Sequence, residues 1–185
     1  MNTRIASLPD IQAEIWEQLA AATADTQHPW RTPVLATING HLADARTVVL
    51  REFDLRDRRF TIYTDERAAK VSQLLSHPVG TLVMWSHQLG WQLRCRVHLA
   101  LEMSGLAASS RWARIKLSPA AQDYLSPLPP GTTIESPEIP THAAVPRDYF
   151  SIITAQVLSI DWLELHELGH RRARFDGNEG RWLQP

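Results

Sequence analysis

The sequence predicts a mainly β protein in which consecutive antiparallel strands curl into a barrel, with helices packed against its outside. Short runs of apolar and β-branched residues recur between turn sequences such as NGHLAD and DLRD, a pattern typical of strands. The connections between these runs are short, as in a meander, and a meander buries its apolar face best by closing on itself. A few segments with helical periodicity lie between these strand-like runs and are the predicted helices.

Length and composition indicate one ordinary domain covering residues 1–185. Hydrophobic residues make up 44% of the chain and charged residues 21%, close to the average of globular domains. The 19 Lys and Arg residues nearly balance the 20 Asp and Glu residues, which argues against a protein that coats nucleic acid or an anionic membrane. The single cysteine, Cys95, and the lack of a long apolar segment predict a cytoplasmic protein.

The first predicted helix spans residues 10–22, because Ile11, Ile15 and Leu19 fall on one stripe, and Asp10 is its expected N-cap. Together with the loop that follows, this helix forms a lead-in over residues 1–28. The predicted strands are 33–38, 46–53, 58–64, 81–86, 92–103, 149–165 and 171–176.

Two further helices are expected between the strands. The first covers residues 66–76, with Asp65 as its N-cap, and the second covers 109–126 with a break near Pro119. Half of the twelve prolines then fall within residues 127–146. This segment is predicted to be an irregular arm that could cover a partner.

Basic and hydroxyl side chains gather where the third predicted strand gives way to a helix. Thr64 ends the strand and Lys70 lies one turn into the helix, whose start offers unpaired N–H groups and a positive dipole end to a phosphate. Arg46 could complete a bidentate clamp, whereas Arg51, five residues later, would lie on the opposite face or end of its strand. The alternative is that all of these are solvated surface cations.

The sequence HELGH at residues 166–170 matches the zinc protease pattern H-E-x-x-H, in which His166 and His170 would bind the metal and Glu167 would act as base. The context disagrees, because the preceding run is rich in β-formers, Gly169 breaks a helix, and the following RRARFD alternates like a strand. We therefore attribute the match to chance and expect no metal site.

The C-terminal region combines tryptophans with arginines, notably Trp162 and Trp182 with Arg172 and Arg174. Tryptophan beside paired cations suits a planar anionic ligand. The equally good alternative is an edge strand whose charges prevent pairing with other chains.

Taken in order, RTVVLR, IYTDERAAK, MWSHQLGWQLR and the W-x7-H-x-R-x-x-F pattern from Trp162 to Phe175 resemble the pyridoxamine 5′-phosphate oxidase family of FMN-binding split barrels. The resemblance runs from about residue 30 to the C-terminus, and it is strongest to the oxidase-related branch, whose ligands vary. It implies a split barrel with FMN at the interface of a homodimer, and an FMN-dependent oxidoreductase that acts on a small molecule.

The resemblance also implies roles for particular residues. The contacts expected from the first subunit are Arg46 and Arg51 to the flavin or its ribityl-phosphate arm, Tyr63 and Thr64 along the flavin, Lys70 at the phosphate, and Gln92 at the isoalloxazine edge. Trp162 and Arg172 would come from the other subunit, and His170 is the candidate catalytic residue. The FMN itself would carry the hydride or the electrons.

The chain departs from the family pattern at two places. The family run R-L-H-D-R is Leu168-Gly169-His170-Arg171-Arg172 here, and Ala69 stands where a phosphate-binding arginine is expected. FMN binding is therefore better supported than vitamin B6 oxidation. The alternatives are a true pyridoxamine or pyridoxine 5′-phosphate oxidase and, from another class, a flavin or haem carrier without turnover.

Overall fold

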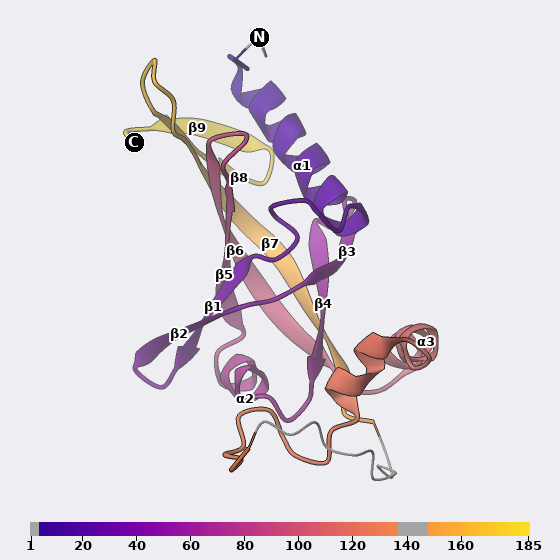
Figure 1. Ribbon diagram of the computed structural model, residues 1–185. Coiled ribbons are helices and arrows are strands. Elements are labelled where there is room, and N and C mark those ends of the chain that lie inside the picture. Colours follow the sequence, from indigo (N-terminus) through magenta and orange to yellow (C-terminus); the bar gives the residue numbers. More distant parts are fainter. Residues whose placement is uncertain (1–3, 137–147) are drawn as a thin grey trace.

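A computed structural model describes residues 4–136 and 148–185, and a nine-stranded antiparallel sheet forms its framework (Figure 1). The main path of the sheet runs β2-β1-β5-β6-β7-β4-β3, and a β8–β9 hairpin is attached to β7. This architecture confirms the predicted mainly β fold. The strands are β1 (Val34–Asn39), β2 (Leu42–Thr47), β3 (Leu50–Asp54), β4 (Arg59–Asp65), β5 (Val79–Ser86), β6 (Trp91–Glu102), β7 (Phe150–Glu164), β8 (Arg171–Asp176) and β9 (Glu179–Leu183).

The long strand β7 links the two halves of the sheet. Along one edge it pairs with β6 over almost its whole length. Along its other edge, residues 150–156 pair with β4 and residues 159–164 pair with β8. The change of partner coincides with a register shift opposite Arg96 and Val97, where Leu158 is the extra residue. The sheet therefore splits at Leu158.

The first helix, α1 (Leu8–Ala24), packs against β3 and β9 and buries Ile11, Ile15 and Leu19, as its periodicity predicts. The expectation that Asp10 caps this helix is wrong. Ser7 is the N-cap, and its hydroxyl accepts a hydrogen bond from the Asp10 backbone N–H.

The helix α2 (Ala69–Ser76) begins later than predicted, and Asp65 does not cap it. The Asp65 carboxylate instead binds the backbone N–H and the guanidinium of Arg67. The Arg67 guanidinium also donates to the carbonyl oxygens of Ser126 and Pro127, so it ties the start of the predicted arm to the entry of α2. Of the arm, residues 137–146 lie outside the described part of the chain.

The predicted helix over 109–126 is two elements, α3 (Leu106–Ile115) and the 3-10 helix η1 (Pro119–Tyr124), separated near Pro119 as expected. Ala108 and Tyr124 from these elements form a small core with Phe150 and Ile152 of β7. The main core lies inside the barrel and under α1. Among the described residues, no helix is long and apolar enough to cross a membrane.

The prediction of one strand over 46–53 is also wrong. Arg46 belongs to β2, which pairs with β1, and Arg51 belongs to β3, which pairs with β4. The strand is interrupted because the backbone N–H groups of Val48 and Leu50 donate to carbonyl oxygens of the preceding loop, at Pro33 and Arg31 respectively. The two arginines therefore lie at opposite ends of the sheet path. The short strand β9 was not predicted.

Candidate functional site

Lys70 and Thr64 meet at the junction between β4 and α2. Lys70 Nζ donates a hydrogen bond of 3.0 Å to Thr64 Oγ1. Thr64 is 2% exposed and Lys70 is partly buried, so the pair is partly shielded from water. The sequence prediction that these two residues lie together is met, and the contact joins the end of a strand to the first turn of a helix.

Burial lowers the pKa of the Lys70 ammonium, and the nearby positive charge of Arg46 lowers it further, while Asp65 opposes both effects. The positive charge of Arg46 therefore acts on Lys70, as the predicted clamp requires. Two cations that destabilise each other in a partly buried place favour a bound anion, because an anion would compensate both the lost hydration and the repulsion.

The start of α2 lies at the same place, and no side chain in the described part of the chain caps it. Its N-cap residue is Ala68, which has no polar side-chain atom. The first N–H groups of a helix have no partner within the helix and carry a partial positive charge. An anion beside Lys70 would therefore meet backbone donors as well as a cation.

A polar network holds Arg46 in place beside this junction. Its guanidinium donates to Thr37 Oγ1, to the Leu35 carbonyl at 3.2 Å, and to Gln73 Oε1 at 2.8 Å. It also forms a salt bridge of 2.6 Å with Asp44. Thr37 and Gln73 are buried, whereas the Asp44 side chain is 41% exposed. Arg46 thus has an internal counter-ion, and that counter-ion is its most accessible partner.

Arg51 and Tyr63 form a separate contact on the side of the sheet that faces α3. The Arg51 guanidinium lies 5.5 Å from the centre of the Tyr63 ring, and Tyr63 Oη donates to Glu52 at 3.3 Å. Glu52 also forms a bidentate salt bridge with Arg111 of α3. Strand alternation explains the separation, because Tyr63 and Thr64 are neighbours in β4 and point to opposite faces.

Gln92 and Arg172 lie in one row across the sheet. Gln92 is opposite Leu163 of β7, and Leu163 is opposite Arg172 of β8. Directly opposed residues share a face, so both side chains project from the same face. Arg172 is held by Asp161, which accepts hydrogen bonds of 3.1 and 2.8 Å from it and 2.7 Å from Arg94.

This row is far from the Lys70 cluster. Thr64 is opposite Ser151 of β7, whereas Gln92 is opposite Leu163, so twelve residues of β7 separate the two sites. At the rise of a β-strand this is roughly 40 Å of extended chain, which is longer than one FMN. Within one chain, therefore, Gln92 belongs with Arg172 and not with Arg46, Thr64 and Lys70.

Trp162 lies in the core, apart from Arg172. Its side chain is 0% exposed and packs edge to face against Trp91, and its indole N–H has no hydrogen-bond partner. It is opposite Ala173, whose side chain is also fully buried, so alternation sends Trp162 inward and Arg172 outward. Trp162 and Arg172 therefore project from opposite faces of the sheet, and the flavin contact expected of both stays a prediction.

The HELGH segment forms the connection between β7 and β8 and contains no helix. The His166 backbone N–H donates to Nδ1 of His170 at 3.2 Å, which is a local turn contact. Within residues 4–136 and 148–185, no group of three or more His, Cys, Asp or Glu side chains could hold a metal ion. The zinc protease interpretation fails because its two histidines do not stand on one helical face. His170 is exposed and lies two residues before Arg172, and its predicted catalytic role stays a prediction.

Sequence reasoning missed the residues that hold these cations, namely Thr37, Asp44 and Gln73 around Arg46, and Asp161 around Arg172. Gln73 follows Lys70 by three positions on a helix, so its placement on the same face was a detectable signal. The positions of Thr37, Asp44 and Asp161 beside these cations depend on how the strands pair, which could not be predicted from the sequence.

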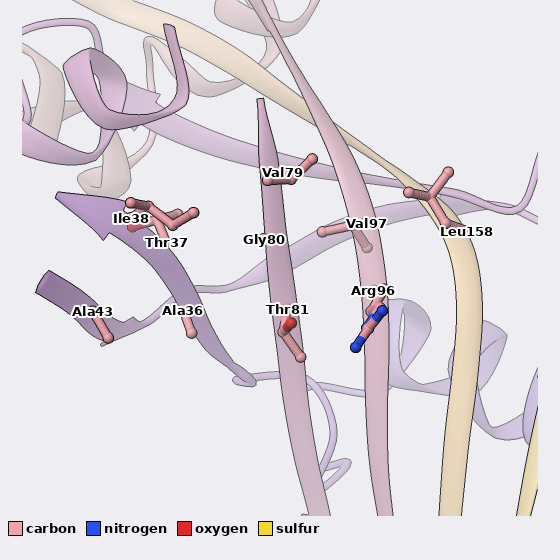
Figure 2. A pocket seen from close by; sticks show the side chains of 10 residues that line it. All are labelled: Ala36, Thr37, Ile38, Ala43, Val79, Gly80, Thr81, Arg96, Val97 and Leu158. Atoms are coloured by element: carbon pink, nitrogen blue, oxygen red, sulfur yellow. The ribbon is translucent and has the colours of Figure 1, made fainter. Parts of the chain in front are cut away.

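The outward face of β1, β5, β6 and β7 carries an apolar groove of about 500 Å³ (Figure 2). Ile38, Val79 and Leu158 line it and are each more than one third exposed, and Arg96 lies at its edge. Val34 and Trp85 extend the exposed apolar surface along β1 and β5. An apolar sheet face of this kind is typical of a surface that another protein covers.

Comparison with known proteins identifies related folds. Residues 13–101 match the family model described as pyridoxamine 5′-phosphate oxidase, FMN-binding domain. No curated protein matches the sequence significantly.

Among solved structures, a pyridoxamine 5′-phosphate oxidase-related, FMN-binding protein from Nostoc punctiforme superposes with a TM-score of 0.72 at 22% identity, covering 97% of this chain and 99% of the other. PhzG from Burkholderia lata, solved with tetrahydrophenazine-1-carboxylic acid, gives 0.71 at 15% identity, covering 100% and 99%. A heme binding protein from Mycobacterium smegmatis gives 0.53 at 16% identity, covering 94% and 60%. These likenesses show that the sheet is a split barrel.

Proposed function

We propose that this protein binds FMN and acts as an FMN-dependent oxidoreductase, because residues 13–101 match the family model of the pyridoxamine 5′-phosphate oxidase FMN-binding domain. The matched range contains Arg46, Thr64 and Lys70. We assign the FMN phosphate to these three side chains and to the start of α2.

One observation carries this proposal. Lys70 is a partly buried cation whose ammonium donates a hydrogen bond to an uncharged hydroxyl, that of Thr64, and whose pKa is lowered by burial and by Arg46. The carboxylate that acts on Lys70, that of Asp65, forms its salt bridge with Arg67 instead. A phosphate group fits the donors present, which are an ammonium, a guanidinium, a hydroxyl and the backbone N–H groups at the start of α2.

We propose further that the working unit is a homodimer. Gln92 and Arg172 are too far from Lys70 to reach the same FMN within one chain, but a second copy could bring its own Gln92 and Arg172 to the site. The apolar groove on the outward face, with Val79 and Leu158 exposed, offers the surface for such contact. The partner's Arg172 would then place positive charge near the flavin and stabilise its reduced, anionic form.

When bound, FMN would supply the hydride or electron transfer, and the chain would bind and orient it. The substrate is a small molecule of undetermined identity. Leu168 replaces the arginine that the family run places before its histidine, so pyridoxamine 5′-phosphate oxidation would need another cation. Arg111 of α3, which could serve, is already neutralised by Glu52. We therefore place the chain in the oxidase-related branch.

The test is the absorbance spectrum of the freshly purified protein, followed by titration with FMN. Flavin absorbance, or its appearance with saturable binding, supports the proposal. A colourless protein that takes up no FMN contradicts it, and a haem spectrum favours a carrier. Hydrogen peroxide release on addition of pyridoxamine 5′-phosphate would identify the specific oxidase activity.

A further inference from the structure

Gln73 lies one helical turn after Lys70 and faces the strands β1 and β2. It is 5% exposed. Its side-chain oxygen accepts hydrogen bonds from Thr37 Oγ1 at 2.6 Å and from Arg46 at 2.8 Å. Its side-chain nitrogen donates to Asp44 at 2.8 Å. This one amide therefore contacts three polar residues of the neighbouring hairpin and connects them to α2.

The chemistry of this network fixes how Gln73 is oriented. Thr37 and Arg46 both present donors, so they require the amide oxygen, and the carboxylate of Asp44 requires the amide nitrogen. The hydrogen bond from Gln73 is also the main reason why the pKa of Asp44 lies below its ordinary value. An amide carries an acceptor and a donor at its end, so Gln73 can bond the guanidinium of Arg46 and the carboxylate of Asp44 simultaneously.

From this arrangement we infer that Gln73 is a positioning residue, which keeps Arg46 oriented toward the FMN phosphate when the phosphate replaces Asp44 as the anionic partner of Arg46. The inference rests on the proposed function. Arg46 can accept a phosphate by exchanging its accessible anionic partner, Asp44, for the ligand. Its bonds to Thr37, Gln73 and the Leu35 carbonyl go to buried residues and can persist. Gln73 thus links the orientation of Arg46 to the helix that carries Lys70.

The experiment compares binding of FMN with binding of riboflavin, which lacks the phosphate. Binding is followed by quenching of flavin fluorescence in the wild type and in Gln73→Glu, Gln73→Met and Thr37→Val. Gln73→Glu keeps the acceptor for Thr37 and Arg46 but adds a negative charge and repels Asp44. Gln73→Met keeps the length of the side chain without its polar atoms, and Thr37→Val removes one partner of Arg46.

For Gln73→Met, which loses the hydrogen bond to Arg46, we expect the Kd of FMN to rise about tenfold, while the Kd of riboflavin stays within about twofold. We expect the same of Gln73→Glu, whose added carboxylate repels the phosphate and competes with it for Arg46. Thr37→Val should shift the ratio in the same direction. A merely structural role would weaken both flavins together. Gln12→Glu on α1 is the control, because it makes the same charge change far from the site (Figure 1).

Unchanged selectivity for FMN over riboflavin in all three variants would overturn the inference. Such a result would mean that Arg46 keeps its orientation without the hydrogen bonds of Gln73 and Thr37. If one variant fails to fold, the other two decide. A wild type that binds riboflavin and FMN equally, or neither, would instead refute the phosphate site of the proposed function, and the inference with it. Inorganic phosphate, which should compete with FMN in the wild type and less in the Gln73 variants, gives an independent measurement.

Discussion

Lys70 and Thr64 are joined by a hydrogen bond of 3.0 Å, from an ammonium in the first turn of α2 to a hydroxyl one residue before the end of β4. This contact places a cation at the start of α2, and within residues 4–136 and 148–185 no carboxylate forms a salt bridge with it. Lys70→Ala should therefore weaken FMN binding by about 1.5–3 kcal/mol, the range for hydrogen bonds to charged groups. Titration calorimetry measures the loss, and riboflavin, which has no phosphate, should bind the variant and the wild type alike.

The pH dependence of FMN binding follows from the lowered pKa of Lys70. Below its ordinary value of 10.5, Lys70 in the empty site already begins to lose its proton, whereas bound phosphate would stabilise the charged form. The affinity for FMN should thus be constant just above neutral pH and fall as the pH rises through the lowered pKa. Lys70→Arg, whose guanidinium does not titrate in this range, should remove the fall.

Asp44 competes with the phosphate for Arg46. Asp44→Asn keeps an oxygen that can accept hydrogen bonds from Gln73 and Arg46, but it removes the negative charge. We expect this variant to bind FMN more tightly, by a few-fold, with the gain largest at low salt because Asp44 is partly exposed. Weaker binding in Asp44→Asn would show that Asp44 orients Arg46 more than it competes with the ligand.

The distance between the Lys70 cluster and the row of Gln92 and Arg172 predicts a site shared between two chains. Lys70→Ala and Arg172→Ala are each expected to weaken FMN binding as homodimers. In a mixed dimer of the two variants, one site combines both substitutions and the other contains neither. Mixed dimers, isolated with two different tags, should therefore bind one FMN with wild-type affinity. If both residues acted within one chain, no site of wild-type affinity would appear.

The order and type of most elements could be predicted from the sequence, because hydrophobic period and turn residues are local signals. Strand 171–176 and the break near Pro119 show this, and the helix containing Lys70 begins within a few residues of its predicted start. The interruption between Arg46 and Arg51 was missed because it depends on hydrogen bonds to a preceding loop, and the β-branched Val48 and Val49 give no sign of it.

The site was predicted as a set of residues but not as a geometry. Sequence order suggested Arg46, Thr64 and Lys70 together, and the structure brings them together. The sequence could not show that Gln92 shares a row with Arg172 or that Trp162 faces inward, because both depend on the register of β7 with its two neighbours. A shift of one residue would reverse which side chains face outward.

The placement of Trp162 gives a last prediction, which separates a core role from a ligand role. Because its side chain is fully buried against Trp91, Trp162→Ala should lower the free energy of unfolding by about 3–5 kcal/mol, as for other large-to-small core substitutions. Trp162→Phe should cost much less, since the indole N–H has no partner to lose. In folded Trp162→Phe the Kd of FMN should equal that of the wild type.

Trp182→Ala, at a residue 47% exposed, is the matched control for stability and should lower the free energy of unfolding far less than Trp162→Ala. A selective loss of FMN affinity in a stable Trp162→Phe protein would mean that the ring turns outward to meet the flavin when two chains associate.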